Sequence, residues 1–158
     1  MDSSEFNVSV ESESTVLEPF ERSLFLALRR LQQAGEVHAK RLSRHGGLTP
    51  VQLLILQVLA GDERLTASAL SERVSLSAAT LSGMLDRLEE RGLVERQRDA
   101  GDRRRQWLRT TTAGRVLLEQ APPLLPPEFR AHFAALAEWE RHSLTAALLR
   151  AAQLCGEE

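Results

Sequence analysis

Apolar residues recur three or four positions apart through most of this 158-residue chain. That spacing places them on one face of an α-helix, which has 3.6 residues per turn. Between residues 48 and 92 the pattern predicts three helices joined by short turns. Their expected spans are 50–61, 66–74 and 77–91.

Residue types at the ends of these spans support the boundaries. Thr49 precedes Pro50, so a capping residue is followed by the residue that best fits the first helical position. Ser77 has a side chain that can cap the third helix, and Gly92 follows that helix as its C-terminal residue. Only residues 75–76 then separate the second helix from the third.

After residue 93 the pattern changes to that of two short strands, 94–98 and 106–110. Between them the sequence Asp-Ala-Gly-Asp at 99–102 has the composition of a turn. The chain is therefore expected to form a β-hairpin here. The apolar positions expected to be buried are Leu93, Val94, Trp107 and Leu108.

The hairpin concentrates positive charge. Residues 96–109 hold six arginines against two aspartates, a net charge of +4 in a chain whose total is −2. The six are Arg96, Arg98, Arg103, Arg104, Arg105 and Arg109. Such a cluster repels itself unless it meets an anionic partner. The alternative is a solvated hairpin whose arginines pair with nearby acids.

Two helices joined by a short turn and followed by a basic hairpin form a winged helix-turn-helix. In that motif the second helix enters the major groove of DNA, and the hairpin, or wing, contacts adjacent phosphates or the minor groove. Aromatic residues make up only 4% of the chain and tyrosine is absent, which argues against single strands, whose bases stack on aromatic rings. Duplex DNA is therefore the expected partner.

Residues 66–114 resemble the central domain of the MarR family of bacterial transcription regulators. The resemblance rests on three motifs and on Thr111 and Gly114, which open the next helix. The motifs are Asp86-Arg87-Leu88-Glu89, Gly92-Leu93-Val94 and Asp102-Arg103-Arg104. With the flanking helices included, the resemblance covers residues 18–154.

The resemblance implies a mainly α fold with a small β wing, in which a winged helix-turn-helix domain is flanked by N- and C-terminal dimerisation helices. The expected parts are a disordered acidic tail at 1–17, a dimerisation helix at 18–45, the winged domain at 46–110 and dimerisation helices at 111–158. A homodimer that represses transcription from a pseudo-palindromic operator is the implied function. A monomer capped by its own flanking helices is the alternative.

The flanking segments show helical periodicity with breaks. Residues 18–44 form an amphipathic pattern, with a bend or fraying expected near Gly35. Proline pairs at 122–123 and 126–127 must kink or interrupt the helix that follows the wing. A final helix is expected to begin near Glu138.

Candidate base contacts lie at the start of the third helix. They are Ser77, Ala79, Thr80 and Ser82, and the resemblance gives Thr80 a role at a base edge. Gly83 departs from the family pattern, because many relatives have arginine there. Specificity is therefore expected to rely more on the wing and on DNA shape. Arg87 is a candidate backbone contact, or else the partner of Glu90 at i,i+3.

At the wing tip the resemblance assigns Arg104 to the minor groove, with Asp102 as the partner that holds it. Arg103 and Arg105 are the expected phosphate contacts. Nineteen of the 20 basic residues are arginine, which favours fixed contacts to phosphates and base edges over loose ammonium contacts.

The resemblance also implies a small aromatic or anionic effector, bound between the dimerisation helices and the winged domain. His38, Arg41 and His45 lie at the end of the first helix and are the candidate pocket residues. The alternative for these three is a solvated basic helix end, which the helix dipole favours.

Other functional classes find little support in the sequence. The histidines are scattered and no phosphate loop or nucleophile elbow occurs, so no enzyme, metal site or cofactor is expected. The lone Cys155 is expected to be a bystander. Without an 18-residue apolar stretch or a signal-peptide pattern, we expect a cytoplasmic protein that does not contact a membrane. A winged helix that binds proteins instead of DNA is the remaining alternative.

Overall fold

The computed structural model describes residues 18–44, 46–62, 64–102 and 105–154. In these ranges the chain is mostly helical, with one antiparallel sheet of two strands. It divides into two units between Val37 and His38. None of the helices in these ranges is both long and apolar enough to cross a membrane.

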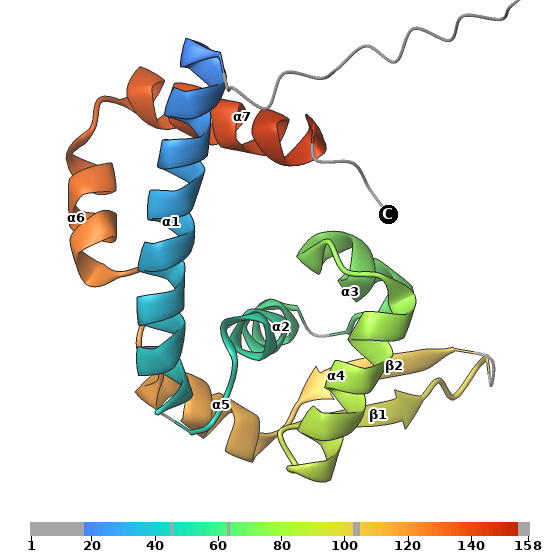
Figure 1. Ribbon diagram of the computed structural model, residues 1–158. Coiled ribbons are helices and arrows are strands. Elements are labelled where there is room, and N and C mark those ends of the chain that lie inside the picture. The colour runs from blue at the N-terminus through green and yellow to red at the C-terminus, as the bar shows by residue number, and fades with distance from the viewer. Residues whose placement is uncertain (1–17, 45, 63, 103–104, 155–158) are drawn as a thin grey trace, which may run out of the picture. The chain divides into compact units, whose positions relative to one another are not determined.

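The first helix, α1 (Pro19–Ser43), is continuous (Figure 1). Of the bend or fraying expected near Gly35, the fraying is wrong, because the helical backbone passes through this residue without a break, and the bend stays a prediction. Only His38 and Leu42, near its C-terminal end, are buried. The apolar side chains of its earlier turns are exposed to solvent.

The three predicted helices of the helix-turn-helix region are confirmed to within one residue at each end. They are α2 (Pro50–Gly61), α3 (Ala67–Val74) and α4 (Ala78–Glu90). Each is capped by a hydroxyl, from Thr49, Thr66 and Ser77 in turn, that accepts a hydrogen bond from a backbone N–H of the first turn.

The turn between α3 and α4 depends on one residue in the left-handed region. Ser75 has φ 52°, and the N–H of Leu76 donates to the carbonyl of Ser71 at 3.1 Å. Gly92, with φ 68°, ends α4 in the same way, and the N–H of Leu93 donates to the carbonyl of Leu88 at 2.9 Å.

The wing consists of β1 (Val94–Arg98) and β2 (Gln106–Thr110), with the predicted bounds. Arg96 lies opposite Leu108, and Gln97 opposite Trp107. Because side chains alternate between the faces of a strand, Arg96 shares the inner face with buried Leu108, and Trp107 lies on the outer face. The expectation that Trp107 is buried is therefore wrong, and its side chain is partly exposed.

One leucine-rich core holds α2, α3, α4 and the base of the wing together. Twelve of the fifteen buried apolar residues in the described ranges are leucines. From α4 the core takes Leu81, Leu85 and Leu88, which share one face of the helix. The wing is also fastened to the segment before α3, because the N–H of Leu108 donates to the carbonyl of Leu65 at 2.8 Å. Figure 1 shows α4 lying beside the wing.

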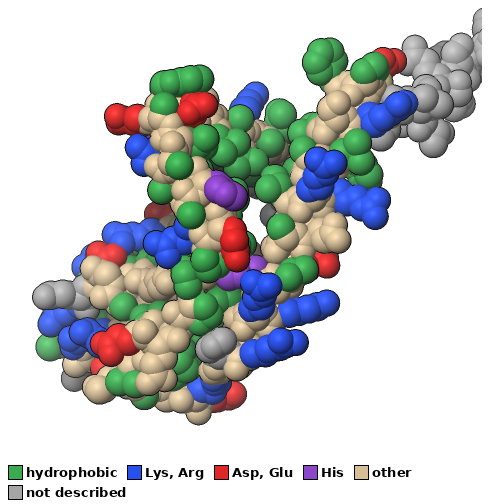
Figure 2. Space-filling view, turned by 90° about the vertical axis from the view of Figure 1, so that its left-hand side faces the viewer, with side chains coloured by type: hydrophobic (Ala, Val, Ile, Leu, Met, Phe, Trp, Pro, Cys, Tyr) green, Lys and Arg blue, Asp and Glu red, His purple; other side chains and the backbone are tan. Residues whose placement is uncertain are grey.

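The chain after the wing forms α5 (Thr112–Gln120), α6 (Pro127–Ala135) and α7 (Glu138–Leu154). The interruption expected at the proline pairs is present between α5 and α6. Neither α6 nor α7 buries a residue in the described chain. Exposed apolar side chains are visible on the molecular surface in Figure 2, and Trp139 and Leu149 of α7 are 69% and 62% exposed.

Gly114 permits α5 to pack closely against the backbone of Leu93, just before β1. A Cβ atom at this position would lie 2.3 Å from the carbonyl oxygen of Leu93 and 2.7 Å from Cγ2 of Thr110. These distances are shorter than any normal contact. The glycine is required because the helix meets backbone there.

We expect Gly114→Ala to lower the free energy of unfolding by about 1–3 kcal/mol, the usual range for overpacking. Gly83→Ala is the matched control, since a Cβ at Gly83 meets nothing within 4 Å. This control should raise the free energy of unfolding by about 1 kcal/mol, because alanine favours a helix interior more than glycine. Urea denaturation measures both, and equal stabilities for wild type and Gly114→Ala would contradict the packing argument.

Candidate nucleic-acid interface

The first turn of α4 presents short polar side chains to solvent. Ser77 Oγ accepts the N–H of Thr80 at 3.3 Å and lies 2.9 Å from Thr80 Oγ1. Ala79, Thr80 and Ser82 are exposed, whereas Leu81 faces the core. The four residues predicted to meet base edges therefore lie together at one exposed helix end.

Further along α4, the exposed face of the helix has open space around Gly83. A Cβ added to Gly83 would meet nothing within 4 Å. Arg87 is exposed, and no ion pair joins it to Glu90, so the alternative of an i,i+3 pairing is absent from the described structure. The Arg87 side chain extends from the same exposed face as Thr80, which is two helical turns closer to the N-terminus.

The turn at the wing tip is organised by Asp99, which the sequence pattern identifies only as a turn residue. Its Oδ1 accepts the backbone N–H groups of Gly101 at 2.7 Å and Asp102 at 2.8 Å. Its Oδ2 accepts the indole N–H of Trp107 at 2.6 Å. These bonds favour the charged carboxylate, and the one from Trp107 contributes most to lowering the pKa of Asp99.

Hydrogen bonds also close the turn across its base. The N–H of Asp99 donates to the carbonyl of Arg105 at 3.0 Å, and the N–H of Arg105 donates to the carbonyl of Asp102 at 2.9 Å. Asp102 Oδ2 lies 3.8 Å from Nε of Arg105. The predicted pair between Asp102 and Arg104 falls outside the described residues, as do Arg103 and Arg104 themselves.

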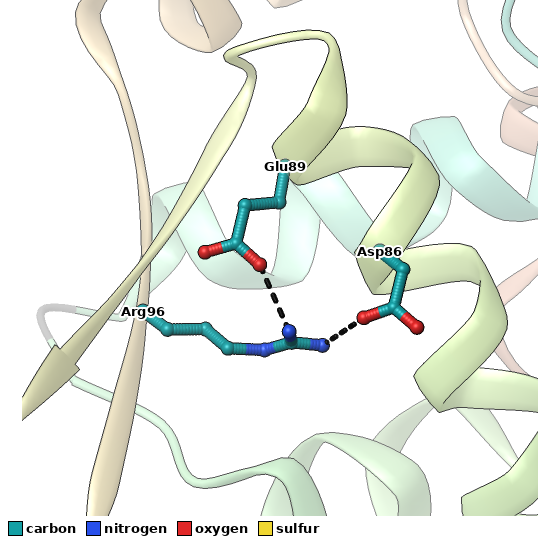
Figure 3. A network of polar contacts seen from close by, with 3 residues as sticks. All are labelled: Asp86, Glu89 and Arg96. Atoms are coloured by element: carbon teal, nitrogen blue, oxygen red, sulfur yellow. Dashed lines mark hydrogen bonds and ion pairs between the residues drawn. The ribbon is translucent and has the colours of Figure 1, made fainter.

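Arg96 does not belong to the projecting charge of the wing. Its Nη1 lies 2.8 Å from Oε2 of Glu89, and its Nη2 lies 2.6 Å from Oδ1 of Asp86 (Figure 3). The expectation that Arg96 belongs to a cluster that needs an external anion is therefore wrong. Strand alternation is the signal that could have predicted the inward position of Arg96, because this residue is two positions after buried Val94 and shares its face of the strand.

The other described wing arginines differ from Arg96 in their surroundings. Arg98 is exposed and Arg109 is half-buried, and neither forms an ion pair with a described residue. Arg105 is exposed, and its pair with Asp102 is long. This part of the wing therefore keeps positive charge that an approaching anion can reach.

The two described effector candidates, His38 and Arg41, differ in their surroundings. His38 is buried, and its Nε2–H donates to the carbonyl of Pro123 at 2.8 Å, so the solvated alternative is wrong for this residue. Its Nδ1 is buried and has no partner among the described groups. Arg41 is exposed, and His45 lies outside the described residues.

A largely apolar cavity of about 570 Å³ lies along α5. Its lining residues come from one face of α5 and from the turn before α2. They are Gly46, Thr112, Ala113, Val116, Leu117, Gln120 and Ala121. A small molecule with a mostly apolar body is the kind of ligand that such a lining accepts.

The sequence model of the MarR family matches residues 46–105. The transcriptional regulator HosA of Escherichia coli O157:H7 is 34% identical over 99 residues, which cover 62% of this chain and 73% of HosA. Among solved structures, the PcaV transcriptional regulator of Streptomyces coelicolor, in complex with its natural ligand, has a TM-score of 0.69. It is 26% identical, and the match covers 89% of this chain and 99% of PcaV.

A DNA complex shows the same fold. Sco3205, a MarR family transcriptional regulator from Streptomyces coelicolor, has a TM-score of 0.74 at 24% identity, with 90% of this chain and 96% of that one covered. The matched family and these three proteins are transcriptional regulators, not enzymes. The winged helix-turn-helix geometry and the sequence similarity agree, and the chain belongs to the MarR family.

Proposed function

We propose that this protein is a ligand-responsive repressor that binds a pseudo-palindromic operator as a homodimer. The observation that carries the proposal is the joint placement of two elements on one leucine core. These are the exposed N-terminal turn of α4 and the arginine-bearing wing. A winged helix uses these two elements to contact one duplex, with the helix in the major groove and the wing beside it.

In this proposal the residues at the start of α4 read base edges, and those of the wing contact the minor groove and phosphates. The base-edge group is Ser77, Ala79, Thr80 and Ser82, with Arg87 on the backbone. Arg104 reaches the minor groove, Asp102 supports the tip, and Arg103 and Arg105 contact phosphates. The exposure of the described members supports these roles, since none of their side chains is buried in the core.

Uncovered apolar surface supports the homodimer. In α7, Trp139, Leu149 and Leu154 are 69%, 62% and 71% exposed. In α1, Phe20 is 91% exposed and Phe25 is 55% exposed. Apolar surface of this extent marks interaction sites in globular proteins. We therefore assign residues 18–45 and 111–158 to dimerisation and 46–110 to DNA binding, inside the cytoplasm where the operator lies.

The cavity along α5 and the unpartnered Nδ1 of His38 support an effector. PcaV is a relative of the same fold that has a natural ligand. We propose a small aromatic or anionic molecule, whose binding favours a dimer with a different separation of its two α4 helices. Because two half-sites on DNA have a fixed spacing, this change releases the operator.

The dimer and its site can be tested together by selecting genomic fragments on the purified protein. We expect a dimer that resists heparin challenge and protects a near-palindrome of roughly 15–25 bp, because two half-sites lie one helical turn apart. Sedimentation and footprinting provide the measurement. A monomer at micromolar concentration with and without DNA, or release of every fragment by heparin, would contradict the proposal.

The two tip arginines should have separable effects. Arg104→Ala should weaken operator binding by roughly 1–3 kcal/mol per subunit, because a desolvated contact in the groove is lost. Arg103→Ala should lower the slope of log K against log salt by about 1 per subunit, because one phosphate contact is lost. Titrations on operator and random duplex at several salt concentrations check both. If both variants kept the wild-type affinities and the wild-type slopes of log K against log salt, the two arginines would be solvated residues that do not contact DNA.

The carboxylate of Asp99 should make the wing turn sensitive to acid. The lowered pKa means that its contribution to stability is complete above the ordinary value of 3.8 and is lost as pH falls through the lower folded-state value. In a Trp139→Phe background, fluorescence of Trp107 should stay constant from neutral pH to this region and change below it. Asp99→Asn is the matched control and should lack that step. A step of the same size in the control would exclude Asp99 as its source.

A further inference from the structure

Arg96 occupies a position where an apolar side chain would be expected. It lies on the inner face of the wing, between Val94 on the same strand and Leu108 on the opposite one. Val94 and Leu108 are 2% and 1% exposed, and the Arg96 side chain is 28% exposed. Partners of opposite charge stabilise a guanidinium that is partly withdrawn from water in this way.

Both partners come from α4 and lie three residues apart, so they share one face of that helix. Asp86 and Glu89 each accept from a different terminal nitrogen of Arg96, at 2.6 and 2.8 Å (Figure 3). A planar guanidinium that is held at two corners has a fixed direction, which a single ammonium group could not provide. The bridge therefore constrains the angle between strand and helix as well as their separation.

Packing does not fix this angle beyond the core. A cavity of about 580 Å³ lies between α3, α4 and the wing, and its lining includes Ser82, Asp86, Arg96 and Gln106. Further out on the inner face, Arg98 and Gln106 are exposed. Among the hydrogen bonds and ion pairs of the described residues, the Arg96 bridge is the outermost one that joins the wing to α4.

We propose that Arg96 is a positioning residue for operator binding, which holds the wing at one angle to α4 through Asp86 and Glu89. The inference rests on the proposed function. Beyond Arg96 the strand β1 continues for two residues before the turn begins, a length of roughly 7 Å, so a tilt of about 10° would move the end of the strand by roughly 1 Å and the turn beyond it by more. Such a shift would separate the wing from the phosphates while α4 stays in its groove.

The geometry also separates this role from that of a phosphate anchor. The two terminal nitrogens of Arg96 are already engaged by two carboxylates, so the cluster of three side chains has a net negative charge. A phosphate would be repelled by that cluster. We therefore expect Arg96 to affect the affinity for the specific site, and not the electrostatic attraction to DNA of any sequence.

The test uses two duplexes of equal length, one obtained by selection from a random library and one scrambled. Arg96→Lys retains the positive charge but lacks the planar guanidinium with its two terminal nitrogens. Arg96→Met removes both the charge and the guanidinium. Each should weaken binding to the selected duplex about tenfold, the scale of losing one ordered contact. Each should leave the scrambled duplex within about twofold and the salt slope unchanged, because no phosphate contact is lost.

Arg98→Met is the matched control, because Arg98 is on the same strand and face but is exposed and without a described ion pair. It should weaken binding to both duplexes by similar factors. Arg96→Met should also lose its effect in the background Asp86→Ala and Glu89→Ala, where both acceptors of the bridge are gone.

Several results would overturn the role of Arg96. These are equal weakening on both duplexes with a lower salt slope, wild-type binding by both Arg96 variants, an undiminished effect in the Asp86→Ala and Glu89→Ala background, or loss of cooperative melting in both variants. If the wild type bound the selected and scrambled duplexes equally, the proposed function would fail, and the inference with it.

Discussion

Burial of leucine side chains at the junction of α2, α3, α4 and the wing is the constraint from which the rest of the structure follows. Each fully buried leucine contributes roughly 1.5–3 kcal/mol relative to an exposed one, and twelve are buried in the described chain. The core uses one face of α4, including Leu81, Leu85 and Leu88, and leaves the opposite face exposed. The same burial that stabilises the domain therefore presents the helix to a partner.

Outside the core, the wing is shaped by polar bonds instead of packing. Arg96 joins its inner face to α4, and Asp99 joins the indole of Trp107 to the backbone of the turn. Charged hydrogen bonds of this kind are stronger and more directional than neutral ones. These bonds hold the two-stranded hairpin in one orientation, because a hairpin by itself has too few contacts to keep one shape.

Local sequence signals were sufficient for the helices and strands, and insufficient for the side chains of the wing. Thr49, Ser77 and Gly92 mark their helix ends through chemistry within a few residues, so the boundaries were predictable. The role of Arg96 depends on which strand face meets α4, and that of Trp107 on a bond to a residue across the turn. The burial of His38 could not be predicted for a similar reason, because its partner Pro123 is 85 residues away in sequence.

Amide hydrogen exchange with and without the selected duplex tests the central claim most directly, that α4 and the wing together form the DNA-binding surface. The account predicts slower exchange on DNA binding in the first turns of α4 and in residues 95–109, and little change in α7. Protection confined to α6 and α7, or protection of α4 without the wing, would contradict it.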